Sequence, residues 1–193
     1  DGQADPSAMQ PYDLNRAAPP RELKACFAHL AEWKKRFPGD AFAYEYHFWR
    51  SQYRDFSGLS HARAIYNDIR HLKAHGLSGI IEDGSQRSFF PTGFCYYVYG
   101  ETLFDASVSF DSLVEDYFSH AFGADWKQVV RYLEGIGARM PVRYFSGCMS
   151  ADPSRGMMYN PAMAETLRTV PEWVDAFRPV IQAHLGQEMR ASD

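Results

Sequence analysis

The sequence predicts an α/β fold in which a β-α-β unit is followed by a largely helical region. Two strand-like segments, 41–49 and 77–84, flank a helix with an amphipathic pattern. Both segments are apolar or aromatic on both faces, which is typical of parallel strands that helices cover on each side. From residue 94 onward, apolar residues recur with helical spacing.

The composition fits a globular protein and argues against two kinds of partner. Of the 193 residues, 46% are hydrophobic, which is enough for a packed core. Lys and Arg total 20 against 24 Asp and Glu, the formal net charge is -4, and no basic tract is present, so we expect no nucleic acid partner. No apolar run is long enough to span a membrane, so no membrane partner is expected. The aromatic content of 16% suits either an aromatic core or the stacking of flat ligands such as sugar rings.

No cofactor or metal is expected. Cys26, Cys95 and Cys148 match neither a zinc spacing nor a disulfide framework, so we interpret them as buried thiols. His71 and His75 have the i, i+4 spacing that can bind a metal, but the residues around them form a charged outer helix face. The localisation is left open. A signal peptide upstream of the first residue would make the protein secreted or periplasmic.

The first half of the chain contains the β-α-β unit. Residues 1–20 are rich in Pro and Ala and predict an extended lead-in. A helix is expected from Arg21 until Pro38 and Gly39 stop it. The strand 41–49 follows, then a polar loop over 50–57, and then a helix capped by Ser60 and ended by Gly76. The second strand, 77–84, leads into a loop that reaches residue 93.

The second half is predicted to be helical. Residues 94–105 are apolar on all sides, which indicates a buried helix. A helix starting at Ser109 or Asp111 is closed by Gly123, and the next is broken around Gly135 and Gly137. A loop over 141–160 places Met157 and Met158 in core gaps. Two or three short helices, interrupted by prolines, follow over 161–186. Since two strands do not complete a sheet, we expect the chain to be part of a larger barrel or to form a homo-oligomer.

The order of several short motifs resembles a known family. These motifs are Tyr44-Glu45-Tyr46 on a strand, the helix that ends at 68–77, the strand Gly79-Ile80-Ile81-Glu82, and the segments 97–104, 109–113, 116–123 and 132–133. Together they resemble the late strands of a glycoside-hydrolase-like barrel in a large, mostly uncharacterised family of carbohydrate-associated proteins, related to α-glucuronidases and family-twenty β-hexosaminidases.

The resemblance implies a fold and a function. The fold is the C-terminal half of a TIM-type (β/α)8 barrel over 21–140, with the lead-in 1–20 before it and a helical extension over 141–193. The function is that of a carbohydrate-active protein, the C-terminal part of a glycoside hydrolase that contributes substrate-binding residues for an oligosaccharide or polysaccharide. The alternative is a non-catalytic carbohydrate-binding or interaction module. In the related glycosidases the general acid lies on an earlier strand, so this chain alone would be incomplete as an enzyme.

Two glutamates at strand ends are the first candidates. Glycoside hydrolysis needs carboxyl groups beside the scissile bond, and the carboxyl ends of barrel strands carry active sites. Glu82 is therefore the catalytic candidate, with an ion pair to Arg87 or a cap on the following loop as the structural alternative. Glu45 is expected to point into the barrel and bind substrate, because a carboxylate is costly against the outer helical layer.

Further substrate-binding candidates surround these glutamates. On an extended strand, His47 and Trp49 share a face with Glu45, which would combine charge, hydrogen bonding and a stacking plane. A hydrogen-bonded core histidine beside a buried indole is the alternative for His47. Asp83, Arg87 and Tyr97 complete the candidates, although each could simply line a loop.

Overall fold

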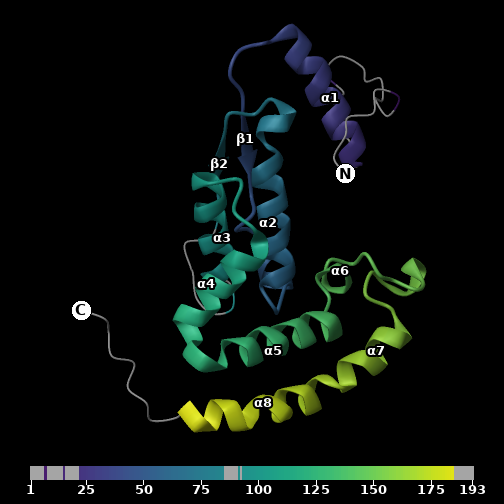
Figure 1. Cartoon of the computed structure of the whole chain (residues 1–193). Coiled ribbons are helices and arrows are strands. Elements are labelled where there is room, and N and C mark those ends of the chain that lie inside the picture. Colours follow the sequence, from purple (N-terminus) through teal and green to yellow (C-terminus); the bar gives the residue numbers. More distant parts are fainter. Residues whose placement is uncertain (1–6, 8–14, 16–21, 85–90, 92, 185–193) are drawn as a thin grey trace. The chain divides into compact units, whose positions relative to one another are not determined.

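The computed structural model describes residues 7, 15, 22–84, 91 and 93–184, and within these ranges the chain is a mixed α/β protein made mostly of helices (Figure 1). Strands β1 (Phe42–Glu45) and β2 (Gly79–Glu82) form a two-stranded parallel sheet there. The predicted α/β class is confirmed at this level. Helices that are both long and apolar enough to cross a membrane are absent from the described ranges. The predicted lead-in lies almost entirely outside them.

The chain separates into two compact units, each built from two segments. The first, which we call the sheet unit, comprises Asp1–Glu45 and His71–Glu82. The second, the helical unit, comprises Tyr46–Arg70 and Asp83–Asp193. The chain therefore passes from one unit to the other after Glu45, after Arg70 and after Glu82.

The sheet unit contains the strands together with helix α1 (Leu23–Arg36) and the 3-10 turn η3 (Lys73–His75). Basic residues fill the last turn of α1, where they interact favourably with the helix dipole. The ring of Phe27 on α1 stacks on His75 at a centroid distance of 4.0 Å. Gly76 ends η3 in the left-handed conformation (φ 72°), as predicted for the residue that stops this segment.

The sheet register pairs the two strands from Phe42 with Gly79 to Glu45 with Glu82. Before the strands begin, the backbone N–H and the hydroxyl of Ser78 both donate to the carbonyl of Ala41, at 2.7 and 3.0 Å. Beyond Glu45 the prediction of a single strand over 41–49 is wrong. The backbone turns at Tyr46, and the Trp49 N–H donates to the Tyr46 carbonyl at 3.2 Å.

In the helical unit, α2 (Leu59–His71, its last residue in the sheet unit), α3 (Gly93–Phe104) and α4 (Phe110–Phe122) form an aromatic core. The fully buried ring of Phe94 lies 5.0 Å from Phe118 and 5.8 Å from Phe110. The prediction that α3 is buried on all sides is wrong, since Phe104 is 92% exposed at its end. Ser109 caps α4 by accepting from the Ser112 N–H, so the structure selects Ser109 from the two predicted starts, Ser109 and Asp111.

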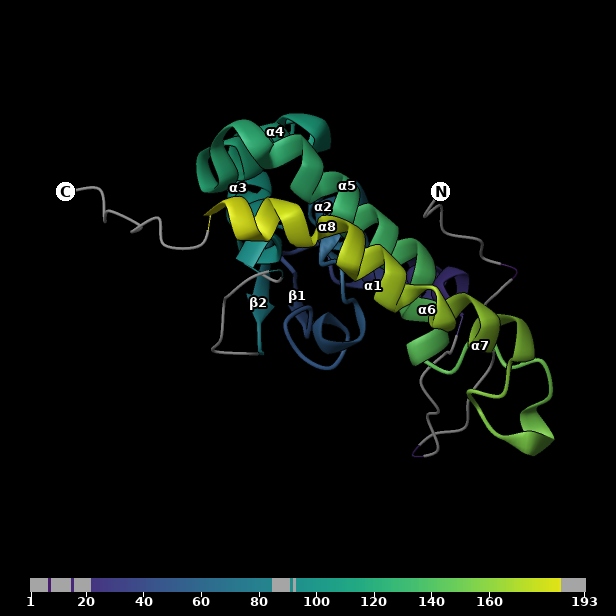
Figure 2. The same ribbon diagram turned by 90° about the horizontal axis from the view of Figure 1, so that it is seen from below.

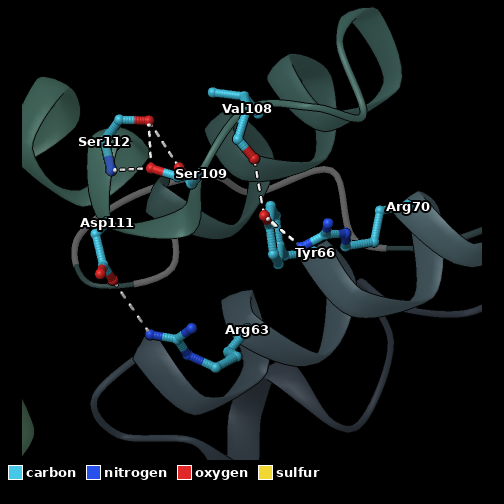
Figure 3. A network of polar contacts seen from close by, with 7 residues as sticks. All are labelled: Arg63, Tyr66, Arg70, Val108, Ser109, Asp111 and Ser112. Carbon is cyan, nitrogen blue, oxygen red and sulfur yellow. Dashed lines mark hydrogen bonds and ion pairs between the residues drawn. The ribbon is translucent and has the colours of Figure 1, made fainter. Parts of the chain in front are cut away.

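Helix α2 is joined to the α3–α4 segment by polar contacts (Figure 3). The Tyr66 hydroxyl donates to the Val108 carbonyl at 2.8 Å and accepts from Arg70 Nη1 at the same distance. Arg63 forms an ion pair with Asp111 at 3.7 Å. Because Tyr66 is almost fully buried, its hydroxyl fixes the position of α2 against the start of α4.

Helix α8 (Val170–His184) runs beside α5 (Trp126–Arg139) (Figure 2). Gly135 and Gly137 lie inside α5 and do not break it, contrary to the prediction. A glycine is required at 135 for packing, since the indole of Trp173 from α8 occupies the space where a Cβ on Gly135 would lie. The Trp173 indole N–H donates to the Tyr132 carbonyl at 3.0 Å, and Arg139 lies 4.2 Å from its ring.

Shorter elements connect α5 to α8. They are α6 (Val142–Phe145), η5 (Pro153–Arg155) and α7 (Pro161–Arg168), whereas η4 (Gly123–Asp125) connects α4 to α5. The interruption expected at Pro171 is present, because α7 ends at Arg168, but Pro179 lies within α8. Met157 and Met158 do not fill core gaps, because they are 69% and 43% exposed.

Candidate functional site

Glu45 and Glu82 are register partners at the carboxyl ends of β1 and β2. Side chains of register partners lie on the same face of a sheet, and parallel strands lie about 4.8 Å apart. Glu45 is exposed and Glu82 is half-buried. Like charges placed side by side on a sheet reduce its stability. This arrangement therefore suits a ligand whose hydroxyl groups or positive charge can interact with both carboxylates.

The two faces of the sheet differ in character. By the alternation of side chains, Ala43 and Ile80 share the face of the glutamates, while Phe42, Tyr44 and Ile81 lie on the other. These last three side chains are 62%, 53% and 45% exposed. The separation of Glu45 from Tyr44 onto opposite faces follows the sequence prediction.

Other candidates belong to the helical unit. Asp83 is exposed directly after β2, and Arg87 lies outside the described residues. Tyr97 on α3 is hydrogen-bonded through its hydroxyl to the Asp116 carboxylate on α4. Burial and this hydrogen bond both raise the pKa of Tyr97. The contact gives Tyr97 a role in holding α3 to α4.

His47 lies in the turn after β1, with its ring directed at α2. The side chain is 8% exposed, and Nε2 lies 3.2 Å from an Asp68 carboxylate oxygen. The His61 ring reaches the His47 backbone carbonyl, with Nε2 2.6 Å from the oxygen. A carbonyl only accepts, so Nε2 of His61 carries a proton. The geometry favours the second interpretation of His47, a histidine hydrogen-bonded within the protein.

The residues that support this turn lie in the segment 50–57, which was predicted to be a polar loop. Asp55 is 3% exposed and accepts from the backbone N–H groups of Ser57 and His61, at 3.0 and 2.7 Å, and from the Ser57 hydroxyl. Gln52 is 2% exposed and donates to the Phe48 carbonyl at 2.7 Å. The Asp-x-Ser spacing ahead of a helix was the signal available, because it is typical of a turn closed by the Asp side chain.

Burial governs the electrostatics of this cluster. Burial lowers the pKa of His61 below its ordinary value, outweighing the hydrogen bond to the His47 carbonyl and the nearby Asp55 and Asp68 carboxylates. Phe48, buried in the same turn, stacks on Tyr96 of α3 at 3.9 Å. The turn is thus held from both α2 and α3.

Outside this support, the turn exposes two aromatic rings. Tyr46 and Trp49 are each 51% exposed, their centroids lie 6.5 Å apart, and their planes meet at 65°. We call Tyr46–Trp49 the aromatic turn. In contrast to the prediction, Trp49 is placed by this turn and not by a strand.

A small pocket lies between α5 and α8. Tyr132 and Phe177 stack in it at 4.4 Å, and its lining is completed by Gln128, Arg131, Trp173, Ala176 and Val180. It holds no carboxylate. A group of three or more metal-ligating side chains is absent from the part of the chain that the structure describes.

Comparison with known proteins finds no family model, no curated protein and no solved structure that matches the chain. Two carboxylates at adjacent strand ends can accept hydrogen bonds from hydroxyl groups or take part in acid-base chemistry, and exposed aromatic rings can stack on a flat ligand.

Proposed function

We propose that this chain is a carbohydrate-active protein, the C-terminal part of a (β/α)8-type glycoside hydrolase, and that it contributes carboxylates to a saccharide site. The observation that supports this proposal is the register of Glu45 with Glu82 at the carboxyl ends of adjacent parallel strands. Barrel enzymes bind substrate at that end of their strands. The motif order that resembles glycoside-hydrolase-like barrels points to the same class.

Within this proposal the two glutamates have different roles. Glycosidases use two carboxyl groups, about 5 Å apart in retaining enzymes and about 6.5–9.5 Å apart in inverting ones. Glu82, which is half-buried, is the candidate for the reaction itself. Glu45, which is exposed, is the candidate for binding sugar hydroxyls. The general acid would come from an earlier strand of the barrel.

The test replaces Glu82 by Gln, which keeps the volume and removes the charge. The assay uses a longer natural protein that contains this chain. On a substrate that this parent protein cleaves, from a panel of aryl glycosides and oligosaccharides, turnover should fall about 10²-fold or more. Glu115→Gln, an exposed position on α4, serves as the matched control and should change nothing. Unchanged turnover by the Glu82 variant contradicts the catalytic assignment. If Glu82 is instead a structural ion-pair member, thermal stability falls and saccharide binding stays at the parent level.

A non-catalytic saccharide-binding module is the second candidate. It is favoured by the short sheet, since the described ranges supply strand-end carboxylates from β1 and β2 alone. Saccharide binding without turnover, weakened by Glu45→Gln and Glu82→Gln, supports this candidate. If neither the chain nor a longer natural protein that contains it binds or cleaves any member of the panel, both candidate functions are excluded.

A further inference from the structure

We propose that the aromatic turn is a preformed stacking site for a sugar ring, and that His61 and Gln52 are the residues that position it. The proposal rests on the proposed carbohydrate function, but it concerns residues of the helical unit alone. Tyr46 and Trp49 carry the contact, and the two buried side chains beneath them fix the backbone between those rings.

The backbone of the turn is fixed at consecutive carbonyls. The His47 carbonyl accepts from the His61 ring at 2.6 Å, and the Phe48 carbonyl accepts from the Gln52 amide at 2.7 Å. The turn itself is closed by the Trp49 N–H on the Tyr46 carbonyl. Both donors come from side chains that are less than one tenth exposed. Such buried hydrogen bonds hold one backbone geometry, so the two flanking rings keep their relative placement.

Gln52 supports this turn although one of its own polar atoms is left without a hydrogen bond. Its amide oxygen is buried and has no hydrogen-bond partner among the described residues. An apolar side chain of similar size would avoid that cost. The glutamine is accounted for by its one good hydrogen bond, the one that holds the Phe48 carbonyl.

The shape and chemistry of the exposed side fit a saccharide. The two rings meet at 65° and are each about half exposed, so one can stack on the apolar face of a pyranose while the other meets its edge. Polar groups for the hydroxyls of the sugar come from the Tyr46 hydroxyl and from Arg50 and Ser51, which are exposed and follow Trp49 directly in the sequence. A rigid turn lowers the ordering cost of binding, because the backbone that carries the two aromatic side chains is already held in place.

The first experiment measures oligosaccharide affinity by titration calorimetry on the whole chain, using oligosaccharides of glucose, xylose and N-acetylglucosamine as probes. Trp49→Ala should lower the affinity about 10-fold or more. Trp33→Ala is the matched control, because Trp33 on α1 is 57% exposed and stacks on Phe37 in the sheet unit. Binding by the parent that Trp49→Ala leaves unchanged overturns the inference and leaves the proposed function standing. A parent that binds none of the probes counts against both.

The second experiment separates positioning from plain stability. Gln52→Met removes the donor to Phe48 and also removes the unpartnered oxygen, so the unfolding midpoint should stay within about 4 °C of the parent. The affinity should nevertheless fall several-fold. His61→Leu should weaken binding in the same way, and His61→Gln, whose amide can still donate to the His47 carbonyl, should restore it. Parent-like affinity in folded Gln52→Met and His61→Leu variants overturns the positioning role.

Discussion

Gly135→Ala tests the contact between α5 and α8 directly. In an exposed helix, replacing Gly by Ala stabilises by about 1 kcal/mol. At Gly135 the added methyl group would overlap the Trp173 indole, which must then move. Overpacking of this kind costs about 1–3 kcal/mol. Loss of the indole hydrogen bond to Tyr132 adds about 1 kcal/mol, and loss of the Arg139 contact about 0.5–1 kcal/mol.

The sum predicts a net loss of about 1.5–4 kcal/mol in the free energy of unfolding for Gly135→Ala, which lowers the midpoint by roughly 3–16 °C in a chain of this size. Gly100→Ala is the matched control, because a Cβ at Gly100 in α3 meets nothing within 4 Å. It should raise the stability by about 1 kcal/mol. Thermal and urea unfolding of both variants measure the difference in sign.

A double-mutant cycle completes this test. With Trp173→Ala in place, the overlap is gone, so adding Gly135→Ala should be neutral or stabilising. A Gly135→Ala variant that is stabilised as much as Gly100→Ala, in the presence of Trp173, would refute the argument that the indole requires a glycine there.

Two further predictions concern ionisable groups. Burial lowers the folded-state pKa of His61, so the stability that its neutral form contributes is fully present above about pH 6.5 and is lost as the pH falls through 6.5 toward the folded pKa. Between about pH 7.5 and 5, the urea midpoint should therefore fall less in His61→Gln than in the parent. Equal pH profiles for the two proteins would contradict this prediction. Burial raises the pKa of the Cys95 thiol to about 12, whereas Cys26 and Cys148 are exposed. A thiol reagent at neutral pH should therefore label Cys26 and Cys148 and leave Cys95 unlabelled until the chain unfolds. Rapid labelling of Cys95 in the native protein would contradict its burial.

The cysteine prediction also corrects the sequence analysis, which expected all three thiols to be buried. Cys26 follows the apolar spacing of α1 yet lies on an exposed side of the helix. A periodic pattern identifies a helix more reliably than it identifies which marginal positions meet a neighbouring element, because the second depends on contacts remote in sequence.

The sequence predicted features of the fold that depend only on residues adjacent in the chain. The cap at Ser109 and the left-handed Gly76 are set by neighbouring residues, so the sequence predicted Gly76 and narrowed the start of α4 to Ser109 or Asp111. The prediction of a break at Gly135 was wrong because the glycine serves to make room for Trp173, remote in the sequence, and does not end the helix. The end of β1 at Glu45 was missed for a related reason, since the turn that follows is fixed by Gln52 and His61.

The candidate site was predicted in part. Strand-end position was enough to bring Glu45 and Glu82 into register, because that follows from parallel pairing alone. The buried Asp55 was overlooked, since a carboxylate in a polar segment gives no sign of burial until its three donors are known. Arg87 lies outside the described residues, so its predicted role stays a prediction.

The three crossings of the chain between its two units bear on how the protein loses its structure. Neither unit is a continuous stretch of sequence, so no single peptide-bond cleavage releases either one intact. The second crossing lies within α2, between Arg70 and His71, so melting of the sheet unit frays the last turn of a helix whose other residues belong to the helical unit. Partial unfolding that begins in the short sheet therefore has a direct route along the backbone into the helices, which favours loss of both units in one cooperative transition.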